Sequence, residues 1–62
     1  MSAEREIIFE FFQIGTTVKV TAIDAATGVE ASIVGDPAAG EAALKRLATQ
    51  KLDYVIAKKN KG

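Results

Sequence analysis

Apolar and polar residues alternate along the first half of the chain with the two-residue period of β-strands. Residues 6–13 form the first predicted strand, which carries apolar side chains on both faces, as interior strands do. Two further alternating runs, residues 18–23 and 29–33, are separated by a segment that begins with Asp24 and ends with Gly28. These two residues predict a β-hairpin, because Asp24 can bond amides two residues on and Gly28 can take a positive φ.

The alternation also predicts the register of a three-stranded meander. Gly15 and Thr16 suit the central positions of a type II′ turn, which pairs Phe11 with Val20. The second hairpin then pairs Val20 with Ile33, and the apolar sets of the strands coincide. The predicted buried face consists of Ile7, Phe9, Phe11, Val18, Val20, Ala22, Val29, Ala31 and Ile33.

The apolar period lengthens after the meander, and a helix is predicted from residue 38 to about residue 50. Asp36 suits the N-cap and Pro37 the first helical position, whereas Gly40 weakens the first turns and favours a later start. Leu47 is placed in the buried stripe, so Leu47→Ala is expected to cost about 2–5 kcal/mol. The predicted stripe consists of Ala43, Leu44, Leu47, Ala48 and then Lys51 or Leu52.

The end of the chain completes the predicted fold. Residues 52–57 are interpreted as a last strand, and residues 58–62 as a polar, mobile tail. Residues 1–62 then form a single small α+β domain with the element order β-β-β-α-β, in which the C-terminal strand is added parallel. The last strand can lie beside the first or the third, and the two-sided apolar character of residues 6–13 favours the order 3-2-1-4.

Composition limits the chemistry that the chain can perform. A chain of 62 residues has a marginal core, and cysteine and histidine are both absent. Disulfides, the usual zinc sites, thiol nucleophiles and the commonest general base are therefore excluded. Glu6 and Glu10 share a strand face but lie about 13–14 Å apart by strand rise, too far for a paired acid and base. We expect neither an enzyme nor a bound cofactor or metal.

The sheet face opposite the helix carries a candidate interface. Ile8, Phe12 and Ile23 lie on this face, which a single helix cannot cover. A small domain has a thermodynamic reason to bury such a patch against a second copy, so we expect a homodimer joined by this face or by an edge strand. A monomer in which Phe12 is simply exposed is the alternative. Base stacking on Phe12 is disfavoured, because Glu10 and Glu30 oppose RNA there.

Charge is unevenly distributed although the formal net charge is zero. Residues 1–43 hold seven acidic and two basic residues, and residues 44–62 hold one acidic and six basic residues. The simpler interpretation is a solvated helix face, and the alternative is a weak binder of nucleic acid or another anionic partner. The residues of this candidate patch are Lys45, Arg46, Lys51, Lys58, Lys59 and Lys61.

Two more features bear on where the protein acts and what it does. The first residues are charged, and no apolar run is long enough for a signal peptide or a bilayer span, which favours a cytoplasmic protein with no membrane partner. The expected function is a small interaction or scaffold module that associates with itself through its sheet, and another protein partner is possible.

Strand and turn segments carry a resemblance to known proteins. The segments are residues 8–11 (IFEF), 18–24 (VKVTAID), 27–28 (TG), 32–35 (SIVG) and 51–55 (KLDYV). Together they resemble a family of short bacterial proteins of unknown function over nearly the whole chain. The resemblance implies a shared fold and brings no activity, cofactor or binding residue.

Overall fold

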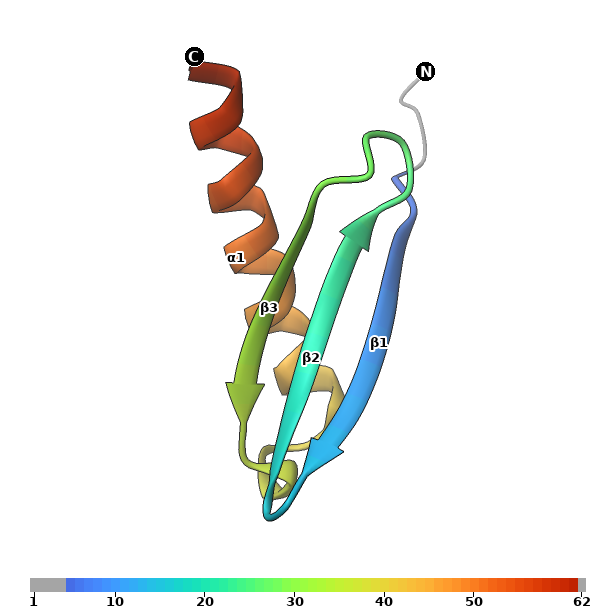
Figure 1. The fold of residues 1–62 in the computed structure, drawn as a ribbon, viewed down its shortest axis with the longest axis vertical. Helices are drawn as coiled ribbons and strands as arrows, with labels where there is room; N and C mark the ends of the chain where they lie inside the picture. Colours follow the sequence, from blue (N-terminus) through green and yellow to red (C-terminus); the bar gives the residue numbers. More distant parts are fainter. Residues whose placement is uncertain (1–4, 62) are drawn as a thin grey trace.

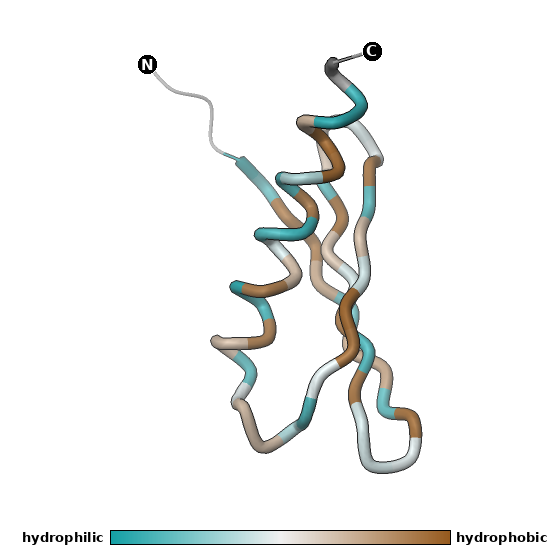
Figure 2. The backbone as a smooth tube through the Cα atoms, turned by 90° about the vertical axis from the view of Figure 1, so that its left-hand side faces the viewer, coloured by the Kyte–Doolittle hydropathy of each residue, from teal (hydrophilic) through white to brown (hydrophobic). Residues whose placement is uncertain are grey.

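The computed structural model describes residues 5–61, with the side chains of residues 5–59. Three strands, β1 (Ile7–Ile14), β2 (Thr17–Asp24) and β3 (Glu30–Gly35), precede a short 3₁₀ turn, η1 (Pro37–Ala39), and a long helix, α1 (Glu41–Lys61). The strands form one antiparallel sheet in the order β1-β2-β3, and α1 lies behind it (Figure 1). Figure 2 shows these two layers from the side.

The register of both hairpins is the predicted one. Phe11 pairs with Val20 and Val20 pairs with Ile33, while Ile8 pairs with Ile23 at the far end of the first hairpin. The apolar odd-numbered residues of β1 therefore lie on the same side of the sheet as their partners in β2, as the alternation required.

Both turns form by the mechanisms read from their residues. Gly15 has a φ of 58° and Thr16 a negative φ, which is the combination of a type II′ turn. Asp24 accepts a hydrogen bond from the backbone N–H of Ala26 through Oδ1, over 2.9 Å. Gly28, with a φ of 79°, donates its N–H to the Asp24 carbonyl over 2.7 Å. Interactions between residues close together in the sequence therefore close both hairpins.

The start of the helix is divided between two elements. Asp36 accepts a hydrogen bond from the N–H of Ala38 and caps η1, with Pro37 at its first position. Gly40 then adopts a φ of 93°, and α1 begins at Glu41. The late start expected from Gly40 is confirmed.

The predicted β-β-β-α-β fold is wrong. Residues 52–57 belong to α1, and no fourth strand is present within residues 5–61. The order 3-2-1-4 fails with it, and β1, for which an interior position was predicted, is an edge strand. Residues 58–61, predicted as a tail, continue the helix, and Gly62 lies outside the described residues.

Helical spacing explains why residues 52–57 do not form a strand. Val55 and Ile56 follow Leu52 at intervals of three and four residues, so they extend the buried side of α1. Neither glycine nor proline interrupts residues 41–61, so nothing stops the helix. Tertiary burial of this stripe outweighs the modest β-preference of its branched residues.

The core lies between α1 and the sheet. Leu52 is completely buried, whereas Leu47 is 49% exposed, so the predicted stripe was misplaced at Leu47 and the large cost of Leu47→Ala is no longer expected. Residues four apart on α1 line up toward the sheet, and Leu47 lies about 100° around the helix from Ala48. The buried core consists of Val18, Val20, Ala22, Ala31, Leu44, Ala48 and Leu52.

The helix does not cover the sheet evenly. It packs on β3 and β2, and it crosses behind the sheet so that its C-terminal end lies beyond the β3 side (Figure 1). Ile7 and Phe9 on β1 are only half-buried as a result, and Phe11 is 40% exposed although it was assigned to the buried face. β1 is thus left with apolar surface on both of its faces.

Candidate interaction surface

The predicted interface residues share the sheet face opposite α1 but do not form one compact patch. Ile8 and Ile23 are direct partners across β1 and β2, and Ile8 is 45% exposed. Phe12 is 66% exposed and pairs with Lys19, so Glu10 and its neighbours separate it from Ile8 along the strand. The three residues therefore lie on one face, but only Ile8 and Ile23 are direct neighbours.

The middle of that face is polar. The hydroxyls of Thr21 and Ser32 lie 2.8 Å apart and share a hydrogen bond across β2 and β3. Thr21 is buried, so this pair is part of the folded sheet. The large apolar residues exposed on this face are Ile8, Phe12 and Ile14 on β1 and Val34 on β3, so most of them lie along the β1 edge.

Two residues of β1 add to this surface beyond the predicted set. Ile14 is 50% exposed, and Phe11 contributes from the helix side of the strand. Sequence patterning assigned Phe11 to the core because it could not show that α1 lies over β2 and β3. We call the exposed residues Ile8, Phe11, Phe12 and Ile14 the β1 surface.

An open depression adjoins the β1 surface on the helix side. Its volume is about 400 Å³, and it lies between β1 and the first turn of α1. Phe11 and Gln13 form its wall on the strand, and Leu44 forms part of the opposite wall. The remaining lining residues are Val18, Pro37 and Glu41.

The candidate basic patch is divided among separate contacts. Lys45 lies 3.6 Å from Glu41 and 5.4 Å from the centre of the Phe9 ring, on the β1 side of α1. Lys51 instead donates a hydrogen bond of 2.8 Å to the carbonyl of Ser32, on the β3 side. These lysines therefore do not form one surface.

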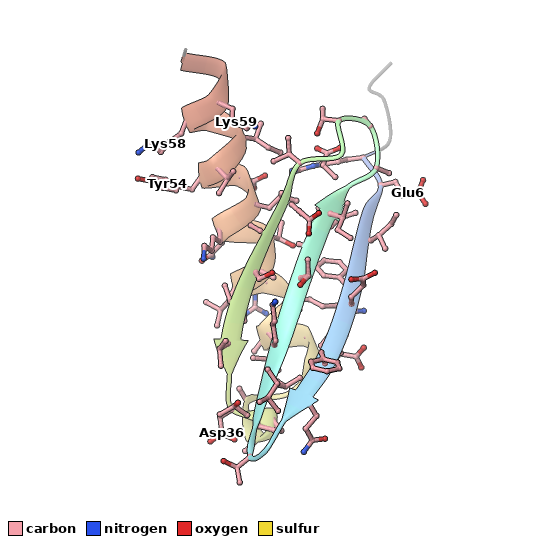
Figure 3. All side chains as sticks on the ribbon, in the orientation of Figure 1. Glu6, Asp36, Tyr54, Lys58 and Lys59 are labelled. Carbon is pink, nitrogen blue, oxygen red and sulfur yellow. The ribbon has the colours of Figure 1, made fainter. Side chains whose placement is uncertain are left out.

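The remaining basic residues lie farther along the helix or face solvent. Lys58 lies 5.5 Å from the centre of the Tyr54 ring, and Figure 3 shows both side chains pointing away from the sheet. Arg46 and Lys59 are exposed, and the side chain of Lys61 lies outside the described part of the chain.

One ion-pair network ties the strand end to the helix. Arg5 lies 2.7 Å from the Asp53 carboxylate and 3.8 Å from that of Asp24. The hydrogen bond that Arg5 donates to the Asp53 carboxylate raises the pKa of the Arg5 guanidinium above its usual value. Because arginine is already charged at neutral pH, this network fixes geometry without introducing a proton switch.

Features of metal and membrane proteins were sought over the same residues. Among the residues that the structure describes, no three acidic side chains come together as a metal site would require. Within residues 5–61, α1 is too polar to cross a bilayer.

Comparison with protein families assigns the chain. The family described as a domain of unknown function, DUF6898, matches residues 4–59. The chain belongs to this family. The match confirms the resemblance read from the strand and turn segments, and no curated protein or solved structure matched the chain. Membership in DUF6898 carries no chemistry with it, so the surface itself must support any functional proposal.

Proposed function

We propose that this DUF6898 protein is a small cytoplasmic interaction module that associates with itself through its β-sheet. The observation that carries the proposal is the distribution of its large apolar residues. None of its phenylalanines is buried, and Phe12, at 66%, is the most exposed large apolar residue of the sheet. Single exposed apolar residues are common, but this eight-residue strand carries four of them, Ile8, Phe12 and Ile14 on one face and Phe11 on the other.

The size of the core supports the same proposal. Three of the seven buried core residues are alanines, which contribute little apolar area. Domains of this length gain stability from disulfides, metals or association, and the chain has no cysteine. Association through the sheet would supply the missing burial.

Sedimentation equilibrium over a hundredfold range of concentration tests the proposal. We expect the wild-type mass to rise above that of the monomer, and Phe12→Glu to remove the association. Val34→Glu is the matched control, because Val34 is 65% exposed on the same face but lies on β3. A monomer mass at every concentration would contradict self-association.

The alternative function, binding of nucleic acid or another anion, receives less support. Lys45 and Lys51 already contact groups within the chain on opposite sides of α1. We expect duplex and single-stranded RNA to bind no tighter than about 10⁻⁵ M at physiological salt, as in non-specific contacts. Submicromolar binding that is lost in a Lys58→Ala plus Lys59→Ala variant would favour this alternative.

A further inference from the structure

The two edges of the sheet differ in what their backbone groups can do. The N–H of Ala25 bonds the carbonyl of Glu6, so even-numbered residues of β1 direct their backbone groups to β2. The N–H and C=O groups of Ile7, Phe9, Phe11 and Gln13 therefore point away from the sheet, along its free edge.

Within residues 5–61, the β3 edge is protected against pairing and the β1 edge is not. On β3, the outward-facing carbonyl of Ser32 accepts a hydrogen bond from the Lys51 ammonium, and α1 packs beside the strand. Lysine and a covering helix are two ways in which proteins prevent an edge strand from pairing. β1 carries neither lysine, arginine nor proline and is eight residues long. A long, apolar, uncovered edge is a template for another strand.

We propose that the β1 strands of two copies pair antiparallel across a two-fold axis that passes between their Glu10 residues. This inference rests on the proposed self-association and names its surface and register. The two sheets then join in the order β3-β2-β1-β1-β2-β3, with both helices on the same face. The four outward-facing residues of each β1 supply about eight backbone hydrogen bonds.

Side-chain matching favours this register over the two neighbouring registers, with the axis at Phe9 or at Phe11. With Glu10 at the axis, Phe9 lies opposite the partner's Phe11, and Ile8 lies opposite the partner's Phe12. Every large apolar residue of Ile8–Phe12 then meets another, which is the favourable case for cross-strand pairs. An axis at Phe9 places Ile8 opposite Glu10, and an axis at Phe11 places Phe12 opposite Glu10. Both of these registers oppose a carboxylate to an apolar group.

The depression beside β1 agrees with the same register. Its strand wall consists of Phe11 and Gln13, which lie opposite the partner's Phe9 and Ile7. These two partner side chains are half-buried in one copy and lie on the helix side of the sheet. Pairing brings these partner side chains to the open side of the depression, so each copy covers apolar surface that is exposed in the other. In the dimer, β1 becomes an interior strand, which is the position that its two apolar faces predicted.

The opposed Glu10 carboxylates are the unfavourable part of the arrangement. They lie on the face away from α1, and Glu10 is exposed, so water and salt reach them. Like charges directly opposite each other weaken a strand pair, which makes position 10 a sensitive reporter of the register.

Single cysteines test the register directly, because the chain has none of its own. In the proposed dimer, position 10 of one copy faces position 10 of the other as a non-hydrogen-bonded pair. The Cα atoms of such a pair lie about 4.5 Å apart, which is within reach of a disulfide. We expect Glu10→Cys to form a covalent dimer under mild oxidation. Glu30→Cys is the matched control, since it replaces an exposed glutamate on the far edge and should stay monomeric under denaturing conditions.

A charge exchange provides the second measurement. Equal amounts of wild type and Glu10→Lys, mixed and examined by native mass spectrometry, should give more mixed dimer than random exchange predicts. If the wild type associates by sedimentation but Glu10→Cys does not cross-link, or cross-links no more than Glu30→Cys, the register is wrong although self-association stands. If the wild type is a monomer, both proposals fail.

Discussion

At the scale of single residues, burial in this protein favours small side chains. Ala22, Ala31 and Ala48 are buried in the core, and Val20 and Leu52 are its largest completely buried residues. Small residues allow α1 to lie close to the sheet, so the aromatic rings remain at the edge or outside. The residues that stabilise the domain are therefore different from those available to a partner.

Leu52 and Leu47 form a matched pair for testing the core. Leu52→Ala should lower the free energy of unfolding by about 2–5 kcal/mol, because Leu52 is fully buried. Leu47→Ala should cost about 1 kcal/mol or less, because half of that side chain is already in water. Urea denaturation followed by circular dichroism measures both. Equal losses would show that the helix is rotated from the orientation described.

Asp24 gives a second test at this scale. Asp24→Ala removes the acceptor for the N–H of Ala26 and should destabilise the protein by about 1–2 kcal/mol. Asp24→Asn keeps an oxygen for that bond and should cost less, so the two variants separate the turn bond from the charge. If both variants melt like the wild type, the turn contributes nothing to stability.

The sequence predicted residues correctly where the cause was local. The positive φ of Gly15 and Gly28 and the bonds of Asp24 and Asp36 depend only on near neighbours, and all four were confirmed. Phe11 and Leu47 were placed wrongly, since their burial depends on where α1 crosses the sheet. That placement is set by packing between distant parts of the chain.

At the scale of elements, the meander was predictable and the end of the chain was not. Alternation fixes which face a strand buries, so a single register satisfied both hairpins. Residues 52–57 are short and apolar, and such a run fits a strand or a buried helix equally well. The absence of any stop signal after Gly40 was the evidence in the sequence that favoured a helix.

Asp53 lies at the boundary between the two interpretations and provides a test of the helix. Asp53→Pro removes an N–H from the middle of α1 and should cost about 3 kcal/mol or more, with a loss of helical ellipticity. Asp53→Ala isolates the loss of the exposed pair with Arg5, which should matter little. A proline variant as helical as Asp53→Ala would mean that α1 ends before residue 53.

At the scale of the whole molecule, β1 lies in a different position from the one that its residues predicted. Its apolar residues on both faces predicted an interior strand, yet within one chain it lies at the edge. The candidate interface residues Ile8, Phe12 and Ile23 do lie on the face opposite α1. The sequence did not show that β1 is the free edge, because an edge is a property of the complete strand order. A second copy is the simplest way to reconcile the character of β1 with its position.

Association through β1 also predicts how stability depends on protein concentration. When folding and association are linked, a tenfold increase in concentration should raise the melting temperature by a few degrees for a domain of this size. Ile8→Lys places a charge on the β1 surface and should abolish this dependence. Val34→Lys introduces the same charge on β3, where the residue is 65% exposed, and should preserve it. Differential scanning calorimetry of the three proteins measures the effect. A wild-type melting temperature independent of concentration would identify β1 as a free edge of a monomer.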